Sequence, residues 1–327
     1  MERLSLVSAP PDADELAAAA RIAEELVAAC AGAVRAPRRA LRAAVACLLS
    51  GGHLLIEDVP GVGKTVLAKS LARAAGCGFA RLQCTADLLP ADVTGVTVFN
   101  QRSQEFEFRA GPVFANVVLV DEINRASPKT QSALLECMEE AQVTVDGETR
   151  PLPRPFMVIA TQNPVEYEGT FPLPEAQLDR FALRISLGYP PPDQEAALLM
   201  DLGRPRSEAT ERVAPVVDGR GLRWVIEVTG RVHADPAVAR YVAELCAATR
   251  VDRRLVLGAS PRAGIALLRA ARALALVRGR GHVLPDDVKE LAPLALAHRI
   301  VLAPSAGGVR AEDVVADVLS RVAVPLA

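Results

Sequence analysis

The stretch "HLLIEDVPGVGKTVLAKSLARAAG" (residues 53–76) joins three kinds of local structure in one segment. The apolar run "HLLIED" is typical of a buried strand, the middle is rich in glycine, and "TVLAKSLARAAG" has the pattern of a helix. A strand, a tight turn and a helix in this order form the first half of a unit that builds parallel sheets. We therefore expect an α/β fold that begins here.

The glycine-rich turn is suited to binding phosphate, because it nearly spells the pattern G-x-x-x-x-G-K-[ST]. Its backbone N–H groups would surround a phosphate at the helix N-terminus, where the helix dipole favours negative charge. Lys64 would reach the β- and γ-phosphates, and Thr65 would offer its hydroxyl to Mg²⁺. Taken alone, the turn could also be an ordinary strand-to-helix connection. The predicted nucleotide-binding residues are Pro60, Gly61, Val62, Gly63, Lys64, Thr65 and Val66.

Asp58 stands where the pattern has its first glycine. Aspartate is one of the few residues that tolerate left-handed backbone or cap a turn with their own carboxylate. The groups that touch phosphate come from the later residues, so we expect Asp58 to replace a conformational glycine and to point away from the phosphates.

Four more short apolar runs follow, at 79–85, 116–122, 156–163 and 181–187, separated by helical stretches. Continuous apolar strands that alternate with helices indicate a parallel sheet covered on both faces. Polar residues stand at the ends of two of these runs, where such sheets present their ligand groups. They are Asp121 and Glu122 in "VVLVDEINRA" and Asn163 in "VIATQNP".

These polar residues decide against the ordinary turn. Asp121 is suited to hold Mg²⁺ through its water shell and Glu122 to polarise an attacking water, because phosphoryl transfer mainly needs positioning and charge. The Asn163 amide, on an adjacent strand, would bridge that water and the γ-phosphate. The sequence therefore predicts ATP and Mg²⁺ as ligands, with Thr65 and Asp121 at the metal.

The pattern of apolar residues changes along the chain and predicts two domains, an α/β core over 1–190 and an all-helical lid over 191–327. The core opens with two helices between 15 and 50, with Asp14 as a plausible N-cap. The proline-rich "YPPPDQE" (189–195) reads as a linker. Beyond it, four capped amphipathic helices appear, with no clear strand among them.

The composition limits the classes of partner that we expect. The chain of 327 residues is 50% hydrophobic and 23% charged, and its net charge of −2 gives no electrostatic reason to expect nucleic acid or an anionic membrane. No long uncharged apolar run predicts a membrane span. Six cysteines without a C-x-x-C pair suit reduced thiols in the cytoplasm.

The order of these motifs resembles the AAA+ ATPase module. The longer sequence segments around the motifs resemble its MoxR family. The phrases that carry this resemblance span roughly residues 20–325, and they are "EDVPGVGKT", "ADLLPADVTG", "FRAGPVFANVVLVDEINRASPKTQSALLECMEE", "VIATQNPVEYEGTFPLPEAQLDRF" and "GASPRAGIALLRAARALAL".

The resemblance implies roles that spacing cannot supply. Arg180 in "EAQLDRF" matches the arginine finger, which reaches the γ-phosphate held by a neighbouring subunit. Arg262 in "SPRAG" matches the sensor 2 arginine, which contacts the γ-phosphate of its own chain. Arg125 is a candidate for a second cation at the subunit interface.

Two insertions match the branch that MoxR shares with magnesium chelatase and MCM-like proteins. Residues 86–112 contain "EFEFR", in which apolar and charged residues alternate as in a strand. A simple nucleotide-binding sheet needs only a helix at this point. The stretch "QVTVDGETRPL" alternates about Asp146 and Gly147, a pair suited to a type I′ turn. Its preceding helix is expected to open with Ser127 as N-cap and Pro128 at the first position.

The reading we adopt is a Mg²⁺-dependent ATPase that forms a homo-oligomeric ring, most simply a hexamer, and remodels a separate protein client. MoxR relatives imply a client with a von Willebrand factor A domain. Two alternatives stay open, a nucleic-acid or metal-insertion motor on the same scaffold, and a nucleotide-gated scaffold with little hydrolysis. The mixed charges of "NQRSQEFEFR" and "DGETR" argue against nucleic acid.

Overall fold

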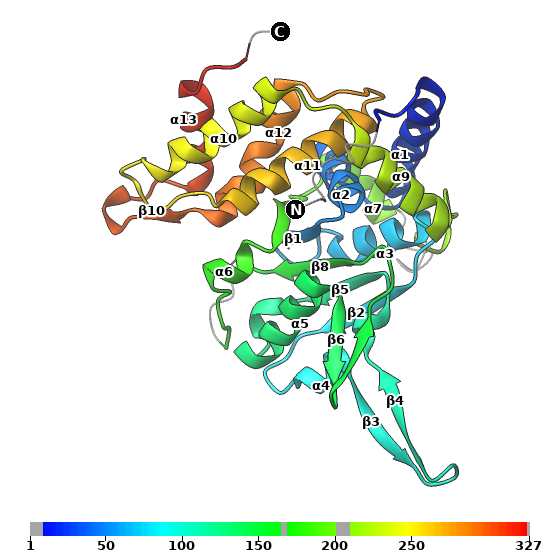
Figure 1. The fold of residues 1–327 in the computed structure, drawn as a ribbon. Coiled ribbons are helices and arrows are strands. Elements are labelled where there is room, and N and C mark those ends of the chain that lie inside the picture. Colours follow the sequence, from blue (N-terminus) through cyan, green and yellow to red (C-terminus); the bar gives the residue numbers. More distant parts are fainter. Residues whose placement is uncertain (1–8, 165–168, 201–209, 326–327) are drawn as a thin grey trace, which may run out of the picture.

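Five parallel strands form the central sheet of the computed structural model, which describes residues 9–164, 169–200 and 210–325. All five apolar runs predicted as strands form strands, which confirms the α/β prediction. The strand order is β2-β5-β8-β1-β9 (Figure 1). The strands are β1 (His53–Glu57), β2 (Phe79–Gln83), β5 (Val117–Asp121), β8 (Met157–Gln162) and β9 (Phe181–Ile185).

Helices of the first half cover this sheet. They are α1 (Ala13–Ala33), α2 (Arg38–Leu49), α3 (Lys64–Ala74) and α5 (Pro128–Glu140), with the short α4 (Pro90–Thr94) and α6 (Glu175–Leu178). Asp12, and not the predicted Asp14, caps α1, because its carboxylate accepts from the Glu15 N–H while Glu15 reaches back to the Asp12 N–H. Ser127 caps α5 with Pro128 at its first position, as predicted.

Two antiparallel hairpins leave the sheet; the sequence predicts strand structure in the first and a hairpin turn in the second. One pairs β3 (Gly95–Asn100) with β4 (Glu105–Ala110) and extends away from the rest of the chain (Figure 1). The other pairs β6 (Gln142–Val145) with β7 (Glu148–Pro151). Asp146 and Gly147 have φ of 51° and 80°, the positive values that a type I′ turn requires.

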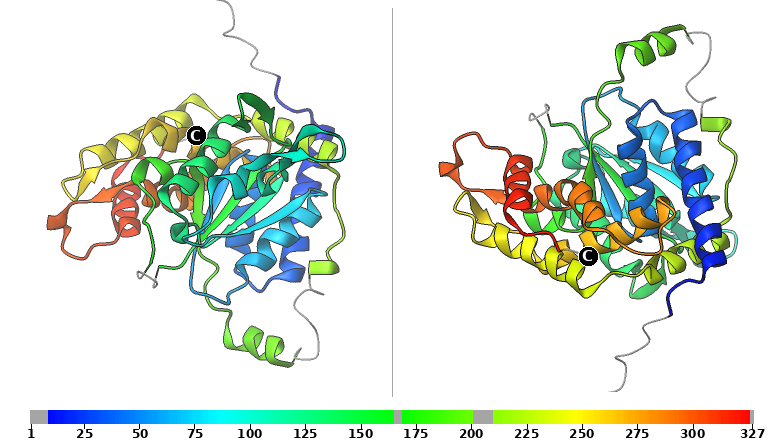
Figure 2. Two further views of the ribbon diagram at one scale, coloured as in Figure 1. Left: turned by 90° about the horizontal axis from the view of Figure 1, so that it is seen from below. Right: turned by 90° about the horizontal axis from the view of Figure 1, so that it is seen from above.

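The second half is helical. Its helices are α7 (Pro192–Met200), α9 (Gly219–Arg231), α10 (Pro236–Arg250), α11 (Pro261–Val277), α12 (Pro285–Leu296) and α13 (Ala311–Arg321). In both views of Figure 2 the helices coloured yellow to red lie together at one side of the molecule.

Three details of this half differ from the sequence prediction. The four predicted helices appear as α10 to α13, but α9 was missed. The lid also holds a short antiparallel ribbon of β10 (Leu255–Leu257) and β11 (Val301–Leu302). The proline-rich linker ends early, because α7 begins at Pro192, where a proline lacks only an N–H that would stay unpaired anyway.

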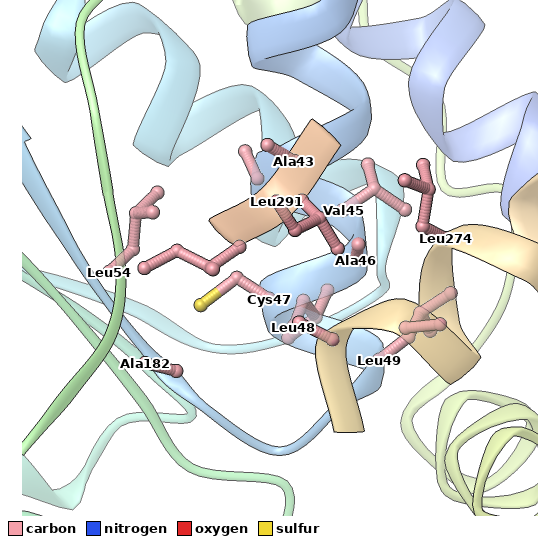
Figure 3. Close-up of a cluster of buried hydrophobic side chains, with 14 of the residues drawn as sticks. Ala43, Val45, Ala46, Cys47, Leu48, Leu49, Leu54, Ala182, Leu274 and Leu291 are labelled. Carbon is pink, nitrogen blue, oxygen red and sulfur yellow. The ribbon is translucent and has the colours of Figure 1, made fainter. Parts of the chain in front are cut away.

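Helix α2 joins the sheet to the lid. Nine of its twelve residues are buried, and its small side chains allow close approach on several sides. Figure 3 shows Ala43 and Leu48 of α2 in one apolar cluster with Leu54 of β1 and with Leu274 and Leu291 of the lid. These residues belong to one continuous hydrophobic cluster. The lid therefore packs on the N-terminal helices, and the core and the lid share one apolar interior.

Candidate nucleotide-binding site

The turn between β1 and α3 has the backbone that phosphate binding needs. Gly61 and Gly63 have φ of 87° and 99°, a region that L-residues rarely adopt. A side chain at Gly63 would also meet Val34, whose Cγ2 lies 2.8 Å from where a Cβ would stand. Gly63 is the N-cap of α3 and brings no side-chain cap, so the first N–H groups of the helix face the turn.

A cavity of about 320 Å³ lies against this turn and reaches the end of β5, two strands from β1 in the sheet. Within the predicted core, the cavity brings the phosphate-binding turn together with Asp121, which lies 60 positions after Gly61. Val62 lines no part of it, because its side chain is buried in the core. Lys69 and Thr210 were missed from the sequence, where neither stands in a motif. The lining residues are Gly61, Gly63, Lys64, Thr65, Val66, Lys69, Asp121 and Thr210.

The Lys64 ammonium lies at the carboxyl ends of two strands. Its Nζ donates to the Asp58 carbonyl oxygen at 2.6 Å and to that of Gln162 at 3.4 Å. Lys64 also lines the cavity beside the turn, so its ammonium stands where an anion bound there would lie.

The Asp58 carboxylate points away from the phosphate-binding turn, as expected. Its Oδ2 accepts from the Ser186 hydroxyl and from the N–H groups of Leu187 and Gly188, at 3.0, 2.6 and 2.8 Å. Its Oδ1 accepts from the Val59 N–H. Asp58 is absent from the residues with positive φ, so its capping ability, and not a left-handed backbone, accounts for the missing glycine. It ties the end of β9 to the start of the turn.

Replacing Asp58 by glycine should lower the free energy of unfolding by about 3 kcal/mol, because one buried N–H group, one half-buried N–H group and a hydroxyl lose a charged acceptor. ATP affinity should stay within a few-fold. Urea unfolding of the nucleotide-free protein and titration with a fluorescent ATP analogue measure the two effects. Asp87→Gly, at an exposed loop position, is the control. Lost ATP affinity with unchanged stability would assign the carboxylate to the phosphates instead.

Asp121 ends β5 and Glu122 follows it, and a threonine on the next strand holds both. The Glu122 N–H donates to Thr161 Oγ1 at 2.9 Å, and this hydroxyl donates to Asp121 Oδ1 at 3.1 Å. Thr161 is buried and was not singled out from the sequence; a threonine inside the apolar run "VIATQN" was the only signal. Glu122 has φ of 56°, an uncommon left-handed value for a non-glycine residue, which turns the chain out of the strand.

Both carboxylates have polar partners on their other side. Arg81 on β2 pairs with Asp121, with 2.8 Å between Nε and Oδ2. Gln83 donates to Glu122 Oε2 at 3.0 Å, and Arg125 pairs with the same oxygen at 2.9 Å. Since Thr161 and Arg81 occupy both Asp121 oxygens, this residue fits a metal held through water. Thr65 and Asp121 line one cavity and supply the hard oxygen donors that Mg²⁺ prefers.

Asn163 follows β8, beside β5 in the sheet, and is buried. It therefore stands at the same carboxyl edge as Asp121 and Glu122. Of the predicted site residues, this edge gathers the phosphate-binding turn, the acid pair and Asn163.

Arg180 and Arg262 lie at the opposite edge. Both line a second cavity of about 310 Å³, together with His53 at the first position of β1. The phosphate-binding turn follows the last position of β1, roughly 13 Å further along the strand. Arg262 thus stands beside the amino end of the sheet in this structure, and its contact with the nucleotide of its own chain stays a prediction.

One carboxylate stands between these two arginines. Glu139, in the last turn of α5, lies 2.8 Å from Arg180 Nη2 through Oε2 and 2.6 Å from Arg262 Nη2 through Oε1. The hydrogen bond from Arg262 and the charges of both arginines lower the pKa of the Glu139 carboxyl. The structure thus brings Arg180 and Arg262 together, although 82 positions separate them.

The sequence matches known families over both halves. The family described as "ATPase family associated with various cellular activities (AAA)" matches residues 53–183, and the AAA lid domain matches residues 247–318. The fold and the site thus define a phosphate-binding-loop protein of the AAA+ class.

Individual relatives refine this class. Chaperone MoxR1 of Mycobacterium tuberculosis is 44% identical over 289 residues, 85% of this chain and 76% of the relative. Protein MoxR of Paracoccus denitrificans is 35% identical, over 84% of this chain and 87% of the relative. A crystal structure from Cytophaga hutchinsonii, described as a candidate ATPase, superposes with a TM-score of 0.87 at 35% identity, over 96% of this chain and 98% of that one. The chain belongs to the MoxR family of AAA+ ATPases.

In the described part of the chain, no helix is long and apolar enough to cross a membrane.

Proposed function

We propose that this protein hydrolyses ATP with Mg²⁺ in a homo-oligomeric ring, most simply a hexamer, and uses the cycle to remodel partner proteins in the cytoplasm. The observation that carries the proposal is the division of the site. The nucleotide-binding groups stand at the carboxyl edge of the sheet, whereas Arg180 and Arg262 stand at the amino edge. A head-to-tail ring places one edge of each subunit against the other edge of its neighbour.

Each residue at the carboxyl edge has a role that its position supports. The N–H groups of Gly61 to Thr65 and the Lys64 ammonium bind the phosphates. Thr65 and Asp121 would hold Mg²⁺, which would neutralise developing charge on the phosphate oxygens. Glu122 orients and polarises the attacking water, and Asn163 bridges that water and the γ-phosphate. Thr161 fixes the acid pair through both of its hydrogen bonds.

At the amino edge, we assign both arginines to the nucleotide of the neighbouring subunit. The pairing of Arg180 and Arg262 on a single carboxylate supports this assignment, because both guanidinium groups face one small anion. Two cations so placed would stabilise the charge of the transition state and make hydrolysis depend on assembly.

A remodelling role is supported by the likeness to a chaperone, and we propose a separate protein client that carries a von Willebrand factor A domain. The β3–β4 and β6–β7 hairpins present mixed charge. Glu105 and Glu107 stand on β4 with Arg109, and Glu148 pairs with Arg150 on β7. Such a surface suits a polypeptide better than the uniform negative charge of nucleic acid.

Phosphate release from ATP tests the proposal. Turnover per subunit should rise with protein concentration, because each site needs a neighbour, and should vanish when EDTA removes Mg²⁺. The wild-type protein is assayed over a hundredfold range of concentration, with and without single-stranded and duplex DNA. Turnover that is independent of concentration would contradict the shared site, and a several-fold rise with DNA would favour the nucleic-acid motor.

The client can be captured with a Glu122→Gln subunit held in the ATP state and compared with the same subunit in ADP. A von Willebrand factor A protein retained only with ATP is the expected result. Retention of nucleic acid in its place would overturn the assignment of the client.

A further inference from the structure

The Glu139 carboxylate forms ion pairs with Arg180 and Arg262, the two arginines that we assign to the nucleotide of the neighbouring subunit. Arg180 is the more completely engaged. Its Nη2 pairs with Glu139, while its Nη1 donates to the Leu135 carbonyl oxygen on the same helix, α5. Both terminal nitrogens of Arg180 are thus directed at its own subunit, and Arg262 donates its Nη2 to the same carboxylate.

Local helix energetics do not account for the position of Glu139. It lies in the last turn of α5, where the helix dipole disfavours negative charge, and Glu140 follows it. The two arginines offset this cost. In return, the carboxylate separates two guanidinium groups that would otherwise repel each other, one before β9 and the other in the lid helix α11.

The contact is accessible and therefore exchangeable. The side chains of Glu139 and Arg262 are 40% and 50% exposed, and that of Arg180 is 27% exposed. All three line the same cavity, together with Arg269. An anion presented by a neighbouring subunit can reach the guanidinium groups without unfolding of any element.

We propose that Glu139 is an internal competitor of the γ-phosphate, a positioning residue that holds Arg180 and Arg262 on their own subunit until a neighbour presents ATP. Carboxylate and phosphate oxygens are alternative acceptors for a guanidinium group. The γ-phosphate offers more charge and one more oxygen, so it displaces the carboxylate, but the exchange weakens the contact between subunits. ADP places no phosphate at this position and leaves the ion pairs in place. The inference rests on the proposed role of both arginines across the interface.

The test is sedimentation velocity of Glu122→Gln protein, in which bound ATP persists, across a range of subunit concentrations. Adding Glu139→Gln should lower the concentration for half-assembly with ATP by about three- to tenfold, since two exposed ion pairs no longer compete. With ADP, the concentration should change by less than about twofold on the same reasoning. Glu136→Gln, which removes one charge from an exposed position of the same helix, is the matched control and should change neither.

The sign of the effect separates this role from a structural one. If Glu139 merely supported the arginines, Glu139→Gln would weaken assembly with ATP, and that result or no difference from Glu136→Gln would overturn the inference. Arg180→Ala in the same background identifies the other failure. Unchanged ATP-dependent assembly of Arg180→Ala would refute the proposed contact across the interface, whereas its loss together with an inert Glu139→Gln would refute only the competition. Thermal unfolding of the nucleotide-free protein should not change on adding Glu139→Gln or Glu136→Gln, because both side chains are exposed.

Discussion

Replacing Glu122 by glutamine should leave ATP bound and reduce hydrolysis by at least about a hundredfold, the cost typical of losing one group that acts on the transition state. Glutamine keeps the size and the hydrogen-bonding reach of the side chain, so the partners Gln83 and Arg125 can still be met. It cannot polarise water as a carboxylate does. The phosphate-binding turn, which holds the nucleotide, is untouched.

Two measurements check this expectation, the ATP affinity from a binding titration and phosphate release at saturating Mg·ATP. Glu136→Gln is again the matched control and should retain wild-type turnover. Unchanged phosphate release by Glu122→Gln would show that the acid pair does not carry the chemistry and would favour the nucleotide-gated scaffold.

Mixing two inactive variants should restore activity, and this is the second large effect we expect. Arg180→Ala lacks the cation but keeps its phosphate-binding turn, and Lys64→Ala has the reverse defect. In a head-to-tail ring, an Arg180→Ala site beside a Lys64→Ala subunit is complete. Random mixing in equal amounts makes such interfaces about one quarter of the total, so turnover should reach about a quarter of the wild-type value.

Each variant alone should be inactive, but at a different step of the ATP cycle. Arg180→Ala should bind ATP with wild-type affinity and lose turnover by about a thousandfold, as loss of an arginine finger does. Lys64→Ala should fail at binding. Turnover is measured for each variant and for the mixture after exchange of subunits. A mixture no more active than its components would place Arg180 outside the neighbour's site.

Local patterns in the sequence were sufficient for most of the nucleotide-binding edge. The five strands are short apolar runs, and in a parallel sheet their carboxyl ends share one edge, so Lys64, Asp121 and Glu122 could be placed together before any contact was known. The hairpin turn at Asp146 and Gly147 follows equally from local backbone preference. Thr161 escaped notice because a threonine in a strand has many structural uses.

The arginines show the limit of that reasoning. Resemblance assigned Arg180 and Arg262 to different nucleotides, since "EAQLDRF" matches the arginine finger and "SPRAG" matches sensor 2. Their meeting at Glu139 depends on how the lid packs against α2 and the amino end of the sheet, a contact between surfaces far apart in the chain. No periodicity or spacing encodes such a contact.

The sequence by itself determined the five core strands, four of the lid helices, the phosphate-binding turn and the acid pair, because these depend on backbone preferences and on neighbours within a few residues. Only the tertiary structure decided what Asp58 and Arg262 contact. Asp58 lies beside Ser186 and Leu187 because β9 is the neighbour of β1 in the sheet, and its carboxylate takes the donors that this neighbour leaves unpaired. Arg262 meets Glu139 because burial of the apolar faces of α2 and α11 brings the start of α11 to the end of α5.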